Sequence, residues 1–399
     1  MRNFFDLVKF EYKKIFMRKS AVIALLIVIG IVCAVPISWF FGTDYRWGED
    51  LTLYQAMVKD REYNLSVSAL PGRLIDETLI VETIEAYSHV PDMERLWDTP
   101  EYVQYARPYD EIYRILYTVY GSHDKILSLT DEDISNFYQY YRDYVVQTIR
   151  AEEISEAAKD KLIRLFDEIE TPLTFEYTDW VVNIFHYATA VFCALALAVC
   201  LAPLFSNEYS TRTDQLILSS KLGKTKLISA KLFAALSLCT MYFIFLHVIS
   251  FMLNASIHGI GGVSDSLRMY LPFCTYPFTL LEIIAIHLIC SFFGMILIAA
   301  LTLFLSSLFK SPFGVIIIAT LLLFVPMMVK VPQTLWLYRL FTLLPTSMMS
   351  LSFSVFSNRP IEAFGVIILP YIYPSLFAVI AGTIMLFFAR MAFRNHQIR

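Results

Sequence analysis

The chain has 399 residues, of which 57% are hydrophobic and only 17% carry charged side chains. Soluble globular domains contain about 25% charged residues, so this composition excludes an ordinary soluble protein and predicts one embedded in a membrane. The net charge of −4 lacks the basic excess typical of nucleic-acid-binding proteins, and we expect no nucleic-acid partner.

The first twenty residues, 1–20, have the pattern of an amphipathic helix. Apolar side chains recur at three- and four-residue spacing at Phe5, Val8, Tyr12, Ile15 and Phe16. Lys9, Lys13 and Lys14 lie largely off this stripe. Such a helix lies in the lipid headgroup region with its lysines towards anionic lipid. The alternative is a positive anchor that only sets the topology.

Six runs without Asp, Glu, Lys or Arg are candidates for membrane-spanning helices. A span needs about 20 residues, because the hydrocarbon core is about 30 Å thick and a helix rises about 1.5 Å per residue. The runs are residues 21–41, 181–205, 232–253, 283–309, 312–329 and 363–389. We therefore expect an all-α polytopic membrane protein with six transmembrane helices, the first of which is a retained span.

A large acidic segment, residues 42–180, separates the first two spans. It holds 29 acidic and 13 basic residues, a net charge of −16. Apolar positions at helical spacing in 131–166 predict a mainly helical domain, and the segment is long enough for one hydrophobic core. It contains no cysteine, so its stability must come from packing without disulfides.

Six tyrosines in this segment follow one another at three- and four-residue steps. They are Tyr102, Tyr105, Tyr109, Tyr113, Tyr117 and Tyr120. Tyrosine offers rigid amphipathic contact area, so the stripe is either the wall of a ligand groove or a half-buried packing face.

The distribution of basic residues predicts the orientation. The proposed cytoplasmic pieces hold 15 basic and 4 acidic residues, and they are 1–20, 206–231, Lys310 and 390–399. Basic residues stay on the cytoplasmic side during insertion. Both termini are therefore expected in the cytoplasm and residues 42–180 outside. Residues 181–399 are expected to form a five-helix bundle that carries the cytoplasmic loop 206–231.

Residues 341–358 are uncharged but rich in Ser and Thr, and they contain Pro345. We expect a re-entrant or interfacial segment on the outer side. The alternative, a seventh span, would place the basic C-terminal tail outside.

Motifs for catalysis are missing from the sequence. Gly223-Lys224-Thr225 is half of a nucleotide-binding loop, but Leu218 stands at the position of the first glycine. There is no HExxH or G-x-S-x-G motif, and the six runs contain no carboxylate for proton coupling. We expect no catalytic residue, no metal site and no cofactor in this chain, which is not expected to be an enzyme.

The loop between the second and third spans carries the most informative residues. It contains EYSTRTDQ (208–215), SSKLGKTK (219–226) and AKL (230–232). This order resembles the membrane subunits of type-2 ABC exporters of Gram-positive bacteria, which often show E-x-x-x-x-T-x-x-L-L-x-S followed by a lysine here. In that family the N-terminal amphipathic helix is an elbow helix, and external domains vary greatly.

The resemblance implies a coupling helix from about Ser210 to Ser219 that docks on a separate ATPase. That partner would bind ATP and Mg²⁺. The expected ATPase-coupling residues are Glu208, Arg212, Thr213, Leu216, Ile217, Lys221 and Lys224. Leu216 and Ile217 would be the apolar anchors, and the basic residues would meet acidic groove edges.

The sequence therefore leads us to expect the permease subunit of an ATP-driven exporter in a bacterial cell membrane. Its partners would be ABC ATPase subunits and a second permease, identical or merely similar, and its substrate a peptide, an antibiotic or a lipid-like molecule. The alternative is a membrane-anchored sensor or immunity protein that binds a peptide through residues 42–180 without transport.

Overall fold

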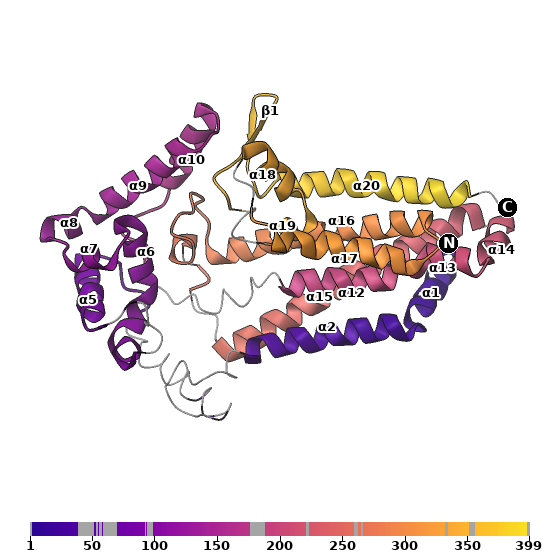
Figure 1. Ribbon diagram of the computed structural model, residues 1–399, viewed down its shortest axis with the longest axis horizontal. Helices are drawn as coiled ribbons and strands as arrows, with labels where there is room; N and C mark the ends of the chain where they lie inside the picture. The colour runs from indigo at the N-terminus through magenta and orange to yellow at the C-terminus, as the bar shows by residue number, and fades with distance from the viewer. Residues whose placement is uncertain are drawn as a thin grey trace.

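The computed structural model is mostly helical and elongated, with a helical bundle at one end and a smaller domain at the other (Figure 1). The structure describes residues 2–38, 70–91, 99–175, 188–220, 223–258, 266–331, 334–350 and 356–396, with a few isolated positions between them.

Five segments of the described chain are long and apolar enough to cross a membrane. They are Lys19–Ile37, Thr189–Ser210, Gly223–Ser256, Leu280–Leu308 and Tyr373–Arg394. They correspond to helix α2 (Lys19–Ser38), helices α12 (Ala188–Leu201) and α13 (Pro203–Ser210), α15 (Ile228–His258), α16 (Leu280–Leu308) and α20 (Tyr373–Arg394). A shorter apolar helix, α17 (Pro312–Met328), covers the fifth predicted run in 17 residues. The count of six spans stays a prediction.

The last predicted run, 363–389, is not one helix. Strands β1 (Ile361–Ala363) and β2 (Val366–Ile368) pair antiparallel, with Ile361 opposite Ile368. Between them Phe364 and Gly365 have φ of 52° and 76°, which makes a tight turn and is incompatible with a right-handed helix. The predicted start of the last span at residue 363 was therefore wrong. Helix α20 begins at Tyr373 and continues past residue 389 to Arg394.

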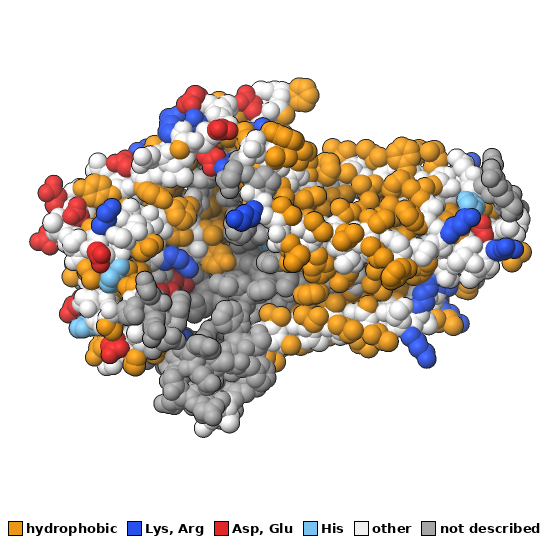
Figure 2. Space-filling view, in the orientation of Figure 1, with side chains coloured by type: hydrophobic (Ala, Val, Ile, Leu, Met, Phe, Trp, Pro, Cys, Tyr) orange, Lys and Arg blue, Asp and Glu red, His pale blue; other side chains and the backbone are white. Residues whose placement is uncertain are grey.

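Helix α16 runs through the centre of the bundle and packs against α12, α15, α17 and α20. Small residues allow close approach, since a Cβ on Gly382 of α20 would lie 3.7 Å from the Cβ of Ala300. Most residues of helices α2 and α20 are half-buried or exposed rather than buried inside the protein. Figure 2 shows apolar side chains along the whole bundle between two charged ends, as expected for a surface that faces lipid.

The Ser- and Thr-rich segment 341–358 begins in the last residues of helix α18 (Leu335–Thr342) and includes the short helix α19 (Pro345–Met348). Helix α19 lies against Gly294 of α16, where an added Cβ would be 2.9 Å from the carbonyl oxygen of Pro345. The hydroxyl of Thr346 donates to the carbonyl of Leu323 in α17 at 2.7 Å. This irregular backbone is therefore covered by protein. Residues 351–355 lie outside the described part of the chain, so re-entry of the whole segment stays a prediction.

Residues 70–91 and 99–175 fold into a helical domain, which we call the external domain after the location predicted for it. Its helices are α5 (Glu77–Ser88), α6 (Asp110–Tyr120), α7 (His123–Leu127), α8 (Asp131–Ser135), α9 (Phe137–Ala151) and α10 (Glu156–Asp167), with short turns at Tyr102–Ala106 and Arg107–Tyr109. Side chains cap several of them, and Thr130 and Asp133 form a capping box at α8.

The tyrosine stripe contributes mainly to packing. Tyr102 and Tyr113 are buried, and the ring of Tyr113 stacks on Tyr87 with centroids 3.6 Å apart. Tyr105 and Tyr117 remain exposed. The packing interpretation is therefore confirmed for the buried members of the stripe.

The core of the external domain is not built from residues 42–180 alone. The segment between α15 and α16, including the 3-10 turn Leu267–Met269, contributes Leu267, Met269 and Tyr276 to the same hydrophobic cluster. Tyr141 donates a hydrogen bond to the carbonyl of Pro272. We call residues 266–279 the inserted loop, because the domain packs around it.

Arg268 is the largest fully buried side chain of the inserted loop. Its guanidinium carbon lies 3.6 Å from the ring centre of Phe166, and its Nη2 donates to the Phe166 carbonyl at 2.6 Å. Stacking on an aromatic face stabilises a desolvated cation. The inserted loop is thereby held at both its backbone and its longest side chain.

Candidate functional site

The chain turns sharply after α13. Thr211 interrupts the helix, and Arg212 takes a left-handed conformation with φ of 57°. Helix α14 (Thr213–Ser219) then runs in a new direction. The expected helix from Ser210 to Ser219 is thus shorter than predicted, because a residue with positive φ cannot continue a right-handed helix.

A second turn returns the chain to α15. The hydroxyl of Ser220 donates to the carbonyl of Ile217 at 2.7 Å. Gly223 then approaches so closely that an added Cβ would lie 1.6 Å from the Ile217 oxygen. Only glycine fits this approach. Gly223, Lys224 and Thr225 belong to a π-helical turn, Gly223–Leu227, that leads into α15.

The expected coupling residues divide into exposed and buried groups. Arg212, Thr213 and Lys224 are exposed, and 73% of the Leu216 surface is accessible. Ile217 is half-buried and packs on the bundle. Lys221 lies outside the described residues.

Glu208 points into the protein rather than outwards. It is 3% exposed and lies against Lys231 of α15, with which it forms an ion pair. Direct contact of this carboxylate with a partner is therefore ruled out in this conformation, although it was expected among the coupling residues.

Two further charged residues complete a buried cluster. Lys231 also binds Glu11 at 3.0 Å, and Lys14 binds Glu208 at 2.8 Å and Glu11 at 3.3 Å. We call Glu11, Lys14, Glu208 and Lys231 the four-charge cluster. Glu11 and Lys231 are fully buried, and alternating signs offset the cost of removing the charges from water.

The four-charge cluster joins three segments that are far apart in sequence. Glu11 and Lys14 come from helix α1 (Arg2–Phe16), Glu208 from α13 and Lys231 from α15. Burial alone would lower the pKa of Lys14, but Glu208 and Glu11 outweigh it and raise that pKa above its usual value of 10.5. The cation is therefore retained at neutral pH.

Sequence reasoning missed Glu11, although it placed Val8 and Ile15 in the apolar stripe of α1. The buried stripe of α1 is Val8, Glu11 and Ile15, whereas Phe5 and Phe16 are 60% and 48% exposed. Glu11 has the same helical spacing as Val8 and Ile15. A carboxylate at a position where the helical spacing predicts an apolar side chain is the signal that could have identified Glu11.

The C-terminal end of α20 and the residues that follow it pack against α13 and α14. The ring of Phe393 is 4.9 Å from that of Phe205, and the His396 ring is 4.5 Å from that of Tyr209. His396 Nε2 is 3.6 Å from an oxygen of the buried Asp214. The backbone of α14 is therefore supported from within the protein, while Leu216 faces outwards.

No family model and no curated protein matches this chain. Among the residues that the structure describes there is no group of three or more His, Cys, Asp or Glu side chains suited to a metal ion.

Proposed function

We propose that this chain is the membrane subunit of an ATP-driven exporter, and that α14 docks on a separate ATPase. The observation that supports this most is the exposure of Leu216 on a short helix whose backbone is fixed from behind. An exposed leucine within a basic segment provides an apolar anchor for a partner's groove, surrounded by charges that match acidic edges.

Movement of such a partner would reach the bundle through α13 and α15, which flank the docking segment. The four-charge cluster holds these two helices to α1, so the three would move together. In this proposal both termini and residues 206–231 are cytoplasmic, and the external domain is outside. Two membrane subunits and two ATPases would form the working unit, with ATP and Mg²⁺ bound by the ATPases.

The test is the substitution Leu216→Asp. Because Leu216 is exposed, the variant should keep the thermal stability of the wild type. We expect it to lose at least about tenfold in affinity for the ATPase that copurifies from native membranes, as for other apolar anchors at interfaces.

Leu127→Asp is the matched control, since Leu127 is an exposed leucine of the external domain. It should leave ATPase capture unchanged. If wild type and Leu216→Asp capture the same ATPase equally well, α14 is not the docking site. If neither captures any ATPase, a membrane-anchored peptide sensor becomes the better proposal.

A further inference from the structure

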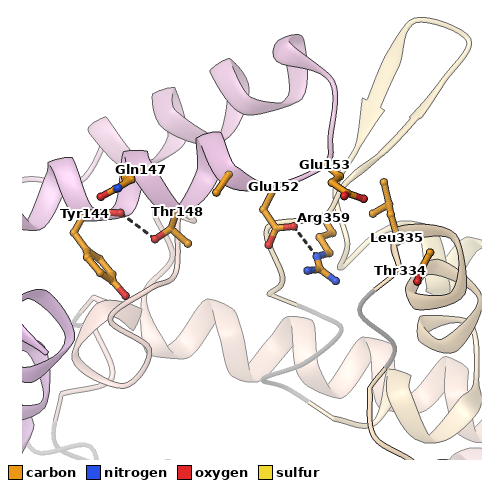
Figure 3. Close-up of a pocket in the computed structure, with 9 residues that line it drawn as sticks. Tyr144, Gln147, Thr148, Glu152, Glu153, Thr334, Leu335 and Arg359 are labelled. Atoms are coloured by element: carbon orange, nitrogen blue, oxygen red, sulfur yellow. Dashed lines mark hydrogen bonds and ion pairs between the residues drawn. The ribbon is translucent and has the colours of Figure 1, made fainter.

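A cavity of about 820 Å³ lies between the external domain and the adjacent end of the bundle (Figure 3). One wall is the C-terminal half of α9, and the other is formed by the start of α18 and by Arg359. Small-molecule sites commonly have volumes of about 300–1,000 Å³ and lie where two parts of a protein meet. The cavity has the size and position of a ligand site.

The lining combines apolar surface with polar side chains of both signs of charge. Its lining residues include Gln147, Thr148, Glu152, Glu153, Leu335 and Arg359. They offer an amide, a hydroxyl, two carboxylates and a guanidinium within one space. A hydrophilic molecule could therefore exchange its hydrogen bonds with water for hydrogen bonds with the wall.

Arg359 is held in place by groups of the protein. Its Nε lies 2.8 Å from a carboxylate oxygen of Glu152, and its guanidinium carbon lies 4.7 Å from the ring centre of Tyr338. This pair connects the end of α9 to the bundle side of the cavity, as the dashed line in Figure 3 shows. The positive charge of Arg359 is thus already balanced by Glu152.

Three charged residues line the cavity, and Glu152 and Arg359 pair with each other. The third, Glu153, has no ion pair or hydrogen bond to another residue that the structure describes. It also borders an adjoining cavity of about 240 Å³, which shares Leu335 with the first. Together the two cavities are lined by three acidic residues, Glu152, Glu153 and Glu362, and by two basic residues, Arg339 and Arg359. The combined groove therefore has one excess negative charge, and Glu153 stands at its middle.

We propose that this groove binds a hydrophilic molecule that carries an ammonium or guanidinium group, such as a short cationic peptide, with the positive group at Glu153. Gln147 and Thr148 bind the polar remainder of the ligand. This inference does not depend on the proposed docking of an ATPase, because binding takes place on the purified chain alone.

The experiment uses the full chain in detergent micelles and isothermal titration calorimetry with tetralysine. Tetraglycine and tetraglutamate are the neutral and acidic reference peptides. We expect saturable binding of tetralysine and about a tenfold loss of affinity in Glu153→Gln, the size expected when one charged hydrogen-bonding partner is removed. Glu132→Gln is the matched control, since Glu132 is exposed at α8 of the same domain.

A second variant, Thr148→Trp, fills the groove without changing its charge. It should abolish the binding of tetralysine. Glu153 is exposed, so Glu153→Gln keeps the fold even if Thr148→Trp does not. Equal affinity of wild type and Glu153→Gln for tetralysine would overturn the proposal. So would the absence of saturable binding, or equal binding of all three peptides.

Discussion

The two ends of the bundle are held together by different physical means. At the end that carries α14, three helices meet at the four-charge cluster, whose members are almost all buried. At the other end, the inserted loop is enclosed by aromatic and aliphatic side chains of the external domain, with Arg268 as its one fully buried charge among the described residues. An ion cluster concentrates stability in a few groups, whereas apolar packing spreads it over many.

The largest effect is expected from Lys231→Ala. This change removes the fully buried cation of the cluster and leaves only the partly exposed Lys14 to balance the carboxylates of Glu11 and Glu208. Loss of one member of a buried ion pair costs about 3–5 kcal/mol. Thermal unfolding in detergent measures the loss. Lys226→Ala, an exposed lysine of the same segment, should unfold like the wild type. Equal melting of the two variants would show that the cluster contributes nothing.

A smaller effect is expected from Arg268→Ala. The substitution removes the stacking on Phe166 and a charged hydrogen bond, and we expect a loss of about 2–4 kcal/mol. Because the contact joins the inserted loop to the external domain, limited proteolysis should cut that domain faster than the bundle. Arg142→Ala is the control, since Arg142 is exposed and forms its ion pair with the exposed Asp167. Uniform cleavage of both regions would contradict this local role.

Gly223→Ala should have an intermediate effect confined to the α14 end. The added Cβ would collide with the Ile217 carbonyl. The backbone shift needed to avoid the collision should lower the free energy of unfolding by about 1–3 kcal/mol. The same change at Gly30 in α2 meets nothing within 4 Å and should be neutral or slightly stabilising. Paired melting curves of the two variants test the comparison, and an unaffected Gly223→Ala would mean that the turn relaxes freely.

The smallest effect is expected at the surface of the external domain. Two hydrogen bonds from Arg73, at 2.7 and 2.8 Å, lower the pKa of Glu82 below its usual value of 4.5. The pair therefore stabilises the fold above pH 4.5, and its contribution is lost as the pH falls through the lowered pKa. With both side chains 35% exposed, solvent screening limits it to about 0.5 kcal/mol.

This surface contribution should also weaken in concentrated salt, whereas the buried four-charge cluster should not. Melting of wild type and Glu82→Gln between about pH 6 and pH 3 checks the expectation. If the two proteins lose stability in parallel over that range, the acid sensitivity of the domain has another origin.

Composition and run length were enough to predict the helical membrane class, because uncharged apolar runs of about 20 residues match the thickness of a bilayer. It also predicted a separate helical domain between the first two runs, from the helical spacing of its apolar residues. At the last run it failed, since apolar content alone does not distinguish a β-hairpin from a helix, and the turn at Phe364 and Gly365 was not recognised.

Which polar residues meet inside the protein became visible in the packing of the helices. Glu208 looked like a docking residue, but it turned out to be the partner of Lys231 and of residues from α1. Arg268 and the inserted loop looked like a simple connection, yet they complete the core of the external domain. Local periodicity reports which face of a segment is buried, whereas pairing between segments some 200 residues apart depends on how the helices pack.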